Sequence, residues 1–67
     1  MHDVISSTIA RIGYEDSSQL LQVNFLNGNI YQYFDVPPAV FQELMASESK
    51  GSYLGKFIRG HFRYARM

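Results

Sequence analysis

The sequence predicts an α+β domain in which a three-stranded antiparallel β-meander is followed by two short helices that pack on it. Three observations lead to this prediction. β-prone runs fill the chain up to residue 35, an Asn-Gly pair separates two of them, and helix-type apolar spacing takes over after two consecutive prolines. A chain of 67 residues forms one domain, residues 1–67, with a small core and marginal stability.

The first element of the meander is a strand over residues 9–14. Residues 1–7 are polar and read as a leading loop. In the strand, alternation places Ala10, Ile12 and Tyr14 on one face, which is typical of an edge strand of a sheet.

A turn over residues 15–18 leads into the second predicted strand, residues 19–26. Its Leu21, Val23 and Phe25 share one face, and amide side chains alternate with them. One side of this strand should therefore be buried and the other should face water.

The third predicted strand, residues 29–35, can pair with the second in two registers. Asn27 and Gly28 alone can form a two-residue loop, or Leu26 can join them in a three-residue loop with Gly28 in a bulge. The two alternatives differ by one residue, and such a shift turns every side chain of the strand to the opposite face.

The register decides where Tyr31 and Tyr33 point. The two-residue loop exposes both rings to water. The three-residue loop pairs Val23 with Tyr31 and Leu21 with Tyr33, and both rings enter the core. We favour this second register, because it leaves three amide side chains together in water: Gln22, Asn24 and Gln32.

Two short helices follow the prolines, since residues that precede a proline are pushed away from helical geometry. The apolar spacing predicts helices over residues 38–47 and 50–59. Ser49 or Ser52 can cap the second helix, and Gly60 can end it.

The predicted core gathers the inward faces of strands and helices: Ile12, Leu21, Val23, Phe25, Val40, Phe41, Leu44, Leu54, Phe57 and Ile58. Replacing Phe57 by alanine is expected to cost roughly 3 to 5 kcal/mol. The tail, residues 61–67, alternates aromatic and basic side chains, and it forms either a short C-terminal strand or a loose arm.

Composition excludes several classes of protein. The chain has no cysteine, so it has neither disulfides nor thiolate metal sites. No apolar run is long enough to span a membrane, and the first residues lack the pattern of a signal peptide. We therefore expect a cytoplasmic protein without membrane contact.

The charges are strongly segregated although the net charge is zero. Residues 1–48 hold six acids and one arginine, whereas residues 49–67 hold five basic residues and no acid. The split either produces internal ion pairs, the interpretation we prefer, or forms a basic surface for an anionic partner.

The sequence resembles the KTSC domain family over nearly its whole length. The resemblance rests on motifs in order: Ser6-Ser7, Ile12-Gly13-Tyr14, Tyr31-Gln32-Tyr33, Val36-Pro37, Ser49-Lys50-Gly51 and Ile58-Arg59-Gly60. The family is named for its occurrence at the C-terminus of some lysyl-tRNA synthetases. The resemblance implies a small domain, often standing alone in bacteria and phages, with no established activity and a suggested role in RNA binding. His61-Phe62 departs from the family, in which Tyr-Pro is common.

No pattern in the chain predicts catalysis. His2 and His61 have no metal-binding or nucleophilic partner at a useful spacing. Glu15 and Asp16 are adjacent in a turn, where carboxylates usually face water. Residues 51–55, GSYLG, lack the spacing of a phosphate-binding loop. We therefore expect no enzyme, no metal and no cofactor.

Two functions fit the sequence. The first is a module for single-stranded or structured RNA, in which basic residues contact phosphates and aromatic rings stack on bases. Its candidate contacts are Lys50, Lys56, Arg59, Arg63, Arg66, Tyr31 and Tyr33. The second is a protein interaction module that pairs an exposed sheet edge with a partner or with a second copy of the chain.

A separate anion site is predicted where the second helix begins. Ser49, Gly51 and Ser52 place hydroxyls and backbone donors at the positive end of the helix dipole, beside Lys50. The alternative, an ordinary serine cap, is the interpretation we prefer.

Overall fold

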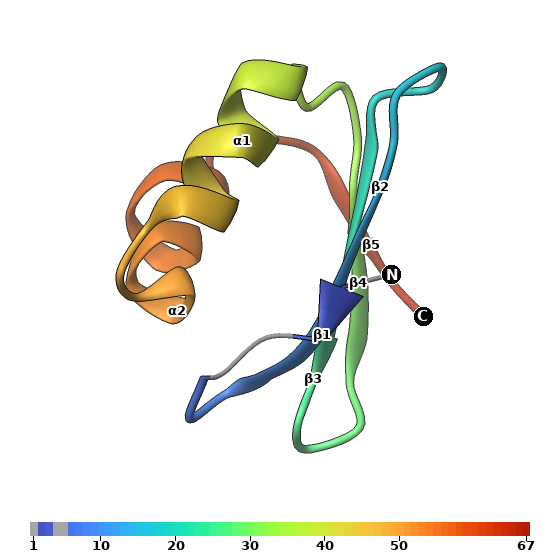
Figure 1. Cartoon of the computed structure of the whole chain (residues 1–67). Helices are drawn as coiled ribbons and strands as arrows, with labels where there is room; N and C mark the ends of the chain where they lie inside the picture. The colour runs from blue at the N-terminus through green and yellow to red at the C-terminus, as the bar shows by residue number, and fades with distance from the viewer. Residues whose placement is uncertain (1, 4–5) are drawn as a thin grey trace.

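The strands form a five-stranded antiparallel sheet in the order β1-β2-β3-β4-β5. The computed structural model describes residues 2–3 and 6–67. The strands are β1 His2–Asp3, β2 Ile9–Glu15, β3 Leu20–Phe25, β4 Ile30–Tyr33 and β5 Tyr64–Arg66. In the described part of the chain the helices lie against one face of this sheet, as Figure 1 shows. The expected α+β class, the central meander and the short C-terminal strand are confirmed.

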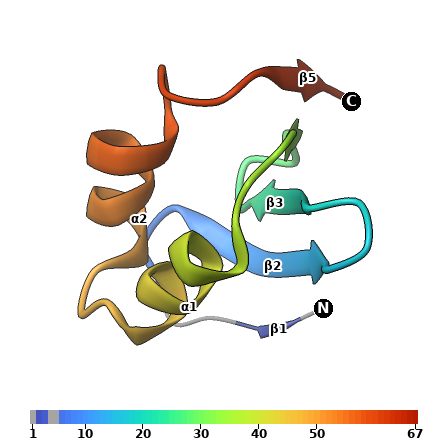
Figure 2. The same ribbon diagram turned by 90° about the horizontal axis from the view of Figure 1, so that it is seen from above.

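The expectation that residues 9–14 form an edge strand is wrong. β1 pairs antiparallel with β2 and brings His2 opposite Ile12 and Asp3 opposite Arg11, so β2 is an inner strand. The leading segment, which we expected to be a loop, therefore contributes a strand of its own. Seen from above in Figure 2, β1 and β5 lie at the two sides of the sheet.

The turn after β3 confirms the register that we favoured. Leu21 lies opposite Tyr33 and Val23 opposite Tyr31. The Phe25 amide donates to the Asn29 carbonyl at 2.8 Å, which leaves a three-residue loop. Gly28 has a φ of +94°, a backbone conformation that glycine adopts without steric cost.

A β-bulge in β2 changes which of its side chains are buried. Ile9 pairs with Phe25 but Arg11 pairs with Asn24, so the register shifts between Ile9 and Arg11. Because the extra residue inverts the alternation at that point, Ile9 and Ile12 are both fully buried. Simple alternation had placed these two side chains on opposite faces.

The helical layer follows the predicted order. It consists of α1 Pro38–Ala46, α2 Lys50–Tyr53 and a π-helical turn, η1 Leu54–Ile58. Ser49 caps α2, since its Oγ accepts from the Ser52 amide at 3.3 Å. In the π turn the Arg59 amide donates to the Leu54 carbonyl at 2.8 Å, and Gly60, with a φ of +80°, ends the segment.

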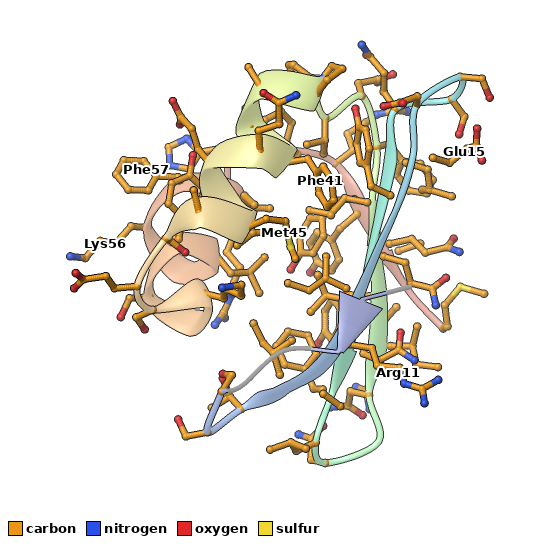
Figure 3. All side chains as sticks on the ribbon, viewed as in Figure 1. Arg11, Glu15, Phe41, Met45, Lys56 and Phe57 are labelled. Atoms are coloured by element: carbon orange, nitrogen blue, oxygen red, sulfur yellow. The ribbon has the colours of Figure 1, made fainter. Side chains whose placement is uncertain are left out.

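The core lies between the sheet and the helical layer. Its buried hydrophobic members are Ile9, Ile12, Leu21, Val23, Tyr33, Val36, Leu44, Leu54 and Ile58. Three predicted members are only partly buried against this cluster: Phe25, Val40 and Phe41. The ring of Phe41 docks α1 by stacking on Tyr14 with centroids 4.6 Å apart. Figure 3 shows Phe41 and Met45 pointing into the space between α1 and the sheet.

The prediction that Phe57 belongs to the core is wrong. Its side chain is 56% exposed and, in Figure 3, projects away from the sheet together with Lys56. Leu54 and Ile58, one turn apart, point inward instead. Phe57 packs beside the ring of Tyr53, with centroids 4.8 Å apart. The apolar stripe of this helix consists of Tyr53, Leu54, Phe57 and Ile58. It is wider than the part of the helix that touches the sheet, so its outer half stays at the surface.

Candidate functional site

Two adjoining pockets lie beside α2 and the end of the sheet. The larger, of about 870 Å³, is called the serine pocket here and is lined chiefly by residues 6–8 and 48–52. The smaller, of about 440 Å³, is called the tyrosine pocket and is lined by Phe25, Asn27, Asn29, Tyr31, Tyr33, Arg59, Gly60 and Tyr64. The two share Phe25, Asn27 and Arg59, so they lie side by side, and together they are called the groove here.

The tyrosine pocket is a consequence of strand pairing. β5 pairs with β4 so that Tyr64 lies opposite Tyr33 and Arg66 opposite Tyr31. The three tyrosine rings therefore share one face of the sheet. The ring of Tyr31 lies 5.7 Å from that of Tyr64 and 6.3 Å from that of Tyr33, measured between centroids.

The three rings differ in their exposure to solvent. Tyr33 is 2% exposed and belongs to the core, whereas Tyr64 is 60% exposed. Tyr31 lies between these extremes and meets Phe25 edge to face, with centroids 5.5 Å apart. The pocket thus has a buried aromatic floor and one ring, that of Tyr64, available at its mouth.

The charge of the tyrosine pocket comes from Arg59. Burial raises the pKa of Tyr33 above its ordinary value, and the nearby positive charge of Arg59 partly offsets this rise. Tyr33 is therefore a neutral phenol at physiological pH. Within the described part of the chain, the residues that line the tyrosine pocket include no carboxylate. This end of the groove is aromatic and positively charged.

The serine pocket is lined by hydroxyls that already hold the backbone. Ser6 Oγ accepts from the amides of Thr8 and Ile9, each at 3.2 Å. Gly51 lets α2 approach this loop closely, since a Cβ at that position would lie 3.0 Å from Thr8 Oγ1. The serine cap that we preferred is present at Ser49. The anion site at Ser49, Gly51 and Ser52 stays a prediction.

Three of the five predicted basic contacts lie in or next to the groove. Lys50 lines the serine pocket, and Arg59 lines both pockets. Arg66 lies opposite Tyr31 and donates from Nη2 to Asn29 Oδ1 at 3.2 Å. The positive charges at the groove thus come from α2, the end of the π turn and β5, which are separate in the sequence.

The other two basic residues point elsewhere. Arg63 forms an ion pair with Asp35 at 3.1 Å, and its guanidinium carbon lies 5.6 Å from the centroid of the Phe34 ring. Lys56 projects from the far side of the helical layer (Figure 3). The Arg63–Asp35 contact is an ion pair between the basic and acidic parts of the chain, of the kind that the charge segregation led us to prefer.

Within residues 2–3 and 6–67, no group of three His, Asp or Glu side chains could hold a metal ion. The pKa of Glu15 is lowered by hydrogen bonds from the Ser17 hydroxyl and amide, as expected for a turn. His61 is exposed, and the side chain of His2 lies outside the described part. No helix in that part is long and apolar enough to cross a membrane.

Sequence reasoning missed four lining residues of the tyrosine pocket as site residues: Phe25, Asn27, Asn29 and Gly60. Tyr64 was considered only as one of several aromatic side chains, interleaved with the basic residues of the last third, that could form a stacking surface. The signal that could have found it is the alternation of the tail itself, because a tail paired with the third strand must place Tyr64 beside one of the two tyrosines there.

The fold is that of a small α+β domain, with a meander sheet covered on one face by a short helical layer. The family profile described as KTSC domain matches residues 5–62, and the chain belongs to this family. A crystal structure of a KTSC domain protein from Yersinia pestis has the same fold, with a TM-score of 0.92 and 34% sequence identity. The match covers 98% of this chain and 93% of that chain.

Relatives of this chain occur both as small proteins and as parts of larger ones. A protein of Tsukamurella paurometabola is 40% identical over 63 residues, which are 94% of each chain. A lysine–tRNA ligase of Nostoc punctiforme is 39% identical over 61 residues, 91% of this chain. The chain spans only 11% of the length of that ligase.

Proposed function

We propose that this domain is a non-enzymatic, cytoplasmic RNA-binding module whose ligand lies in the groove formed by the serine and tyrosine pockets. The observation that carries the proposal is the meeting of Arg59 with the rings of Tyr31, Tyr33 and Tyr64 in one pocket lined by no carboxylate. Proteins that bind nucleic acid commonly combine a positively charged groove with aromatic side chains. A related segment is part of several lysine–tRNA ligases, enzymes whose name includes transfer RNA. This relationship also supports RNA as the anionic ligand of the domain.

Phosphate contacts would supply most of the affinity. Lys50, Arg59 and Arg66 are the contacts that the groove favours, because each lies in it or beside it. Lys56 and Arg63 have the weaker role of long-range attraction. Lys56 points away from the groove, and Arg63 is already paired with Asp35.

A salt titration tests this proposal. Binding of transfer RNA and of a mixed single-stranded RNA is measured at several salt concentrations, for the natural chain and for two variants. Arg59→Ala should weaken binding and lower the slope of log affinity against log salt by about one unit. Lys56→Ala, which removes an exposed charge outside the groove, is the matched control and should change the slope far less.

The result that would overturn the proposal is the absence of binding to either RNA at low salt. Equal effects of Arg59→Ala and Lys56→Ala on RNA affinity would show that the groove is not the binding site. Each variant's melting temperature shows whether the fold is intact.

A second candidate function is self-association through β5. This strand is the last in the sheet order, so its outer side is an edge. Tyr64 in the strand and Met67 just after it are 60% and 69% exposed. Edge strands can pair with a second chain. A stable homodimer in sedimentation, together with no RNA binding, would favour this function over the first.

A further inference from the structure

The tyrosine pocket has the size and composition of a site for one flat, partly polar group. Its volume of about 440 Å³ falls within the roughly 300 to 1,000 Å³ range of small-molecule sites. Its floor is the buried ring of Tyr33, and the exposed ring of Tyr64 stands at its mouth. A planar ligand can therefore lie on Tyr64 and still contact the interior of the pocket.

The two asparagines of the pocket are oriented by the protein. Asn27 Oδ1 accepts from the Asn29 amide at 3.0 Å, and Asn29 Oδ1 accepts from Arg66 at 3.2 Å. These hydrogen bonds fix the orientation of the two side-chain amides, and their NH₂ groups can donate to a ligand. Nucleobases carry carbonyl oxygens and ring nitrogens that accept such hydrogen bonds.

Positive charge lies at the junction of the two pockets. Arg59 lines both of them, and Lys50 lines the serine pocket together with one carboxylate, that of Glu48. A ligand with an aromatic group on Tyr64 therefore carries its anionic group toward Arg59 and the serine pocket. A nucleotide has this combination of a flat base and a phosphate.

We infer that the groove takes an unpaired nucleotide of RNA, with its base on Tyr64 in the tyrosine pocket and its phosphate at Arg59. This inference rests on the proposed function and specifies its ligand. A base in a duplex is stacked and paired on its faces and edges, so it cannot enter a pocket, whereas a base in a single strand can be splayed out. The domain should therefore select single-stranded over double-stranded RNA.

Three RNA ligands of equal phosphate number test the inference. They are a five-nucleotide adenosine RNA, the same backbone without bases, and a duplex matched in the number of phosphates. The single strand should bind about tenfold more tightly than the abasic backbone, which is the gain expected from stacking one base. Tyr64→Ala should remove this difference, because it removes the ring on which the base stacks.

The matched control is Phe57→Ala, which removes an exposed ring outside both pockets. It should leave all three affinities unchanged. Tyr64→Phe keeps the ring and should keep the preference for the single strand, which separates stacking from loss of the fold.

Two outcomes would overturn the inference but not the proposed function. Equal affinity for the abasic backbone and the intact strand means that phosphates alone are bound. Equal affinity for the duplex means that no base enters a pocket. Absence of binding to all three ligands and to transfer RNA would overturn both.

Discussion

Tyr33 and Tyr64 lie opposite each other on β4 and β5, with ring centroids 6.0 Å apart, yet the first is 2% exposed and the second 60%. One ring is part of the hydrophobic core, and its neighbour faces solvent. The pair therefore connects the interior of the domain to the groove. Substitutions at the two positions should separate stability from binding.

Tyr33→Ala should destabilise the fold by roughly 3 to 5 kcal/mol, as truncation of a buried aromatic side chain generally does. Tyr64→Ala should cost about 1 kcal/mol or less, because its ring is mostly in solvent and loses only a surface aromatic contact. Urea unfolding of both variants measures this difference. Similar losses of stability in the two would show that Tyr64 is as deeply packed as Tyr33.

The inward and outward sides of the helical layer give a second stability test. Ile58→Ala should cost roughly 2 to 5 kcal/mol, because Ile58 is fully buried. Phe57→Ala should cost about 1 kcal/mol or less, because it removes only a surface ring pair with Tyr53. Thermal melting of the two variants provides the comparison. A larger loss for Phe57→Ala would restore the expectation drawn from the sequence.

The domain should lose stability at alkaline pH. Burial raises the pKa values of Tyr14 and Tyr33, and a hydrogen bond to Glu43 raises that of Tyr53. The folded chain thus holds these protons more tightly than the unfolded chain. The stabilisation is fully present below the ordinary tyrosine pKa of about 10 and is lost as the pH rises through the raised values.

Urea unfolding at a series of pH values measures this dependence. The free energy of unfolding should fall above about pH 10, and the fall should be shallower in Tyr33→Phe, which has no phenol to titrate at that position. The two chains differ only in this phenol, so contributions from the rest of the chain cancel in the comparison. An equally steep fall in the variant would assign the loss to other groups.

Two glycines allow a matched backbone test. A Cβ at Gly28 or at Gly55 would meet nothing within 4 Å, but only Gly28, with a φ of +94°, has a left-handed backbone. Gly28→Ala should therefore destabilise by about 1 kcal/mol or more. Gly55→Ala should be neutral or stabilise by up to about 1 kcal/mol, because alanine is the better helix former. Destabilisation of the same size at both positions would contradict the role of the loop conformation.

Local patterns were sufficient to predict the centre of the fold. Alternation in the second strand and the position of Gly28 led to the observed register, because this register places Gln22, Asn24 and Gln32 together in water. The bulge beside Ile9 was not predictable in this way, since it depends on how the hairpin loop and the preceding loop meet. Leu26 donates from its amide to the Thr8 carbonyl at 2.8 Å, a contact between segments that alternation cannot describe.

The candidate site was predictable in part. The basic tail and the two tyrosines of the third strand were identified from composition and spacing, and the structure brings Arg59 and Arg66 to these tyrosines. Which basic residues would meet was not predictable. Arg63 and Arg66 are three residues apart on a short segment, yet one pairs with Asp35 and the other with Asn29, because their places relative to β4 differ.

The position of β5 in the sheet has a consequence for the order in which the groove is built. β2, β3 and β4 are consecutive and joined by short turns, whereas both helices separate β4 from β5. Closing a long loop has a larger entropic cost than closing a hairpin, so β5 should join the sheet late in folding. It should also detach readily in brief local openings of the sheet. Hydrogen exchange at its amides should therefore be faster than in β2, β3 and β4, and slower only than in β1. A ligand that stacks on Tyr64 would hold this strand in place, and slower exchange from Tyr64 to Arg66 would report its occupancy.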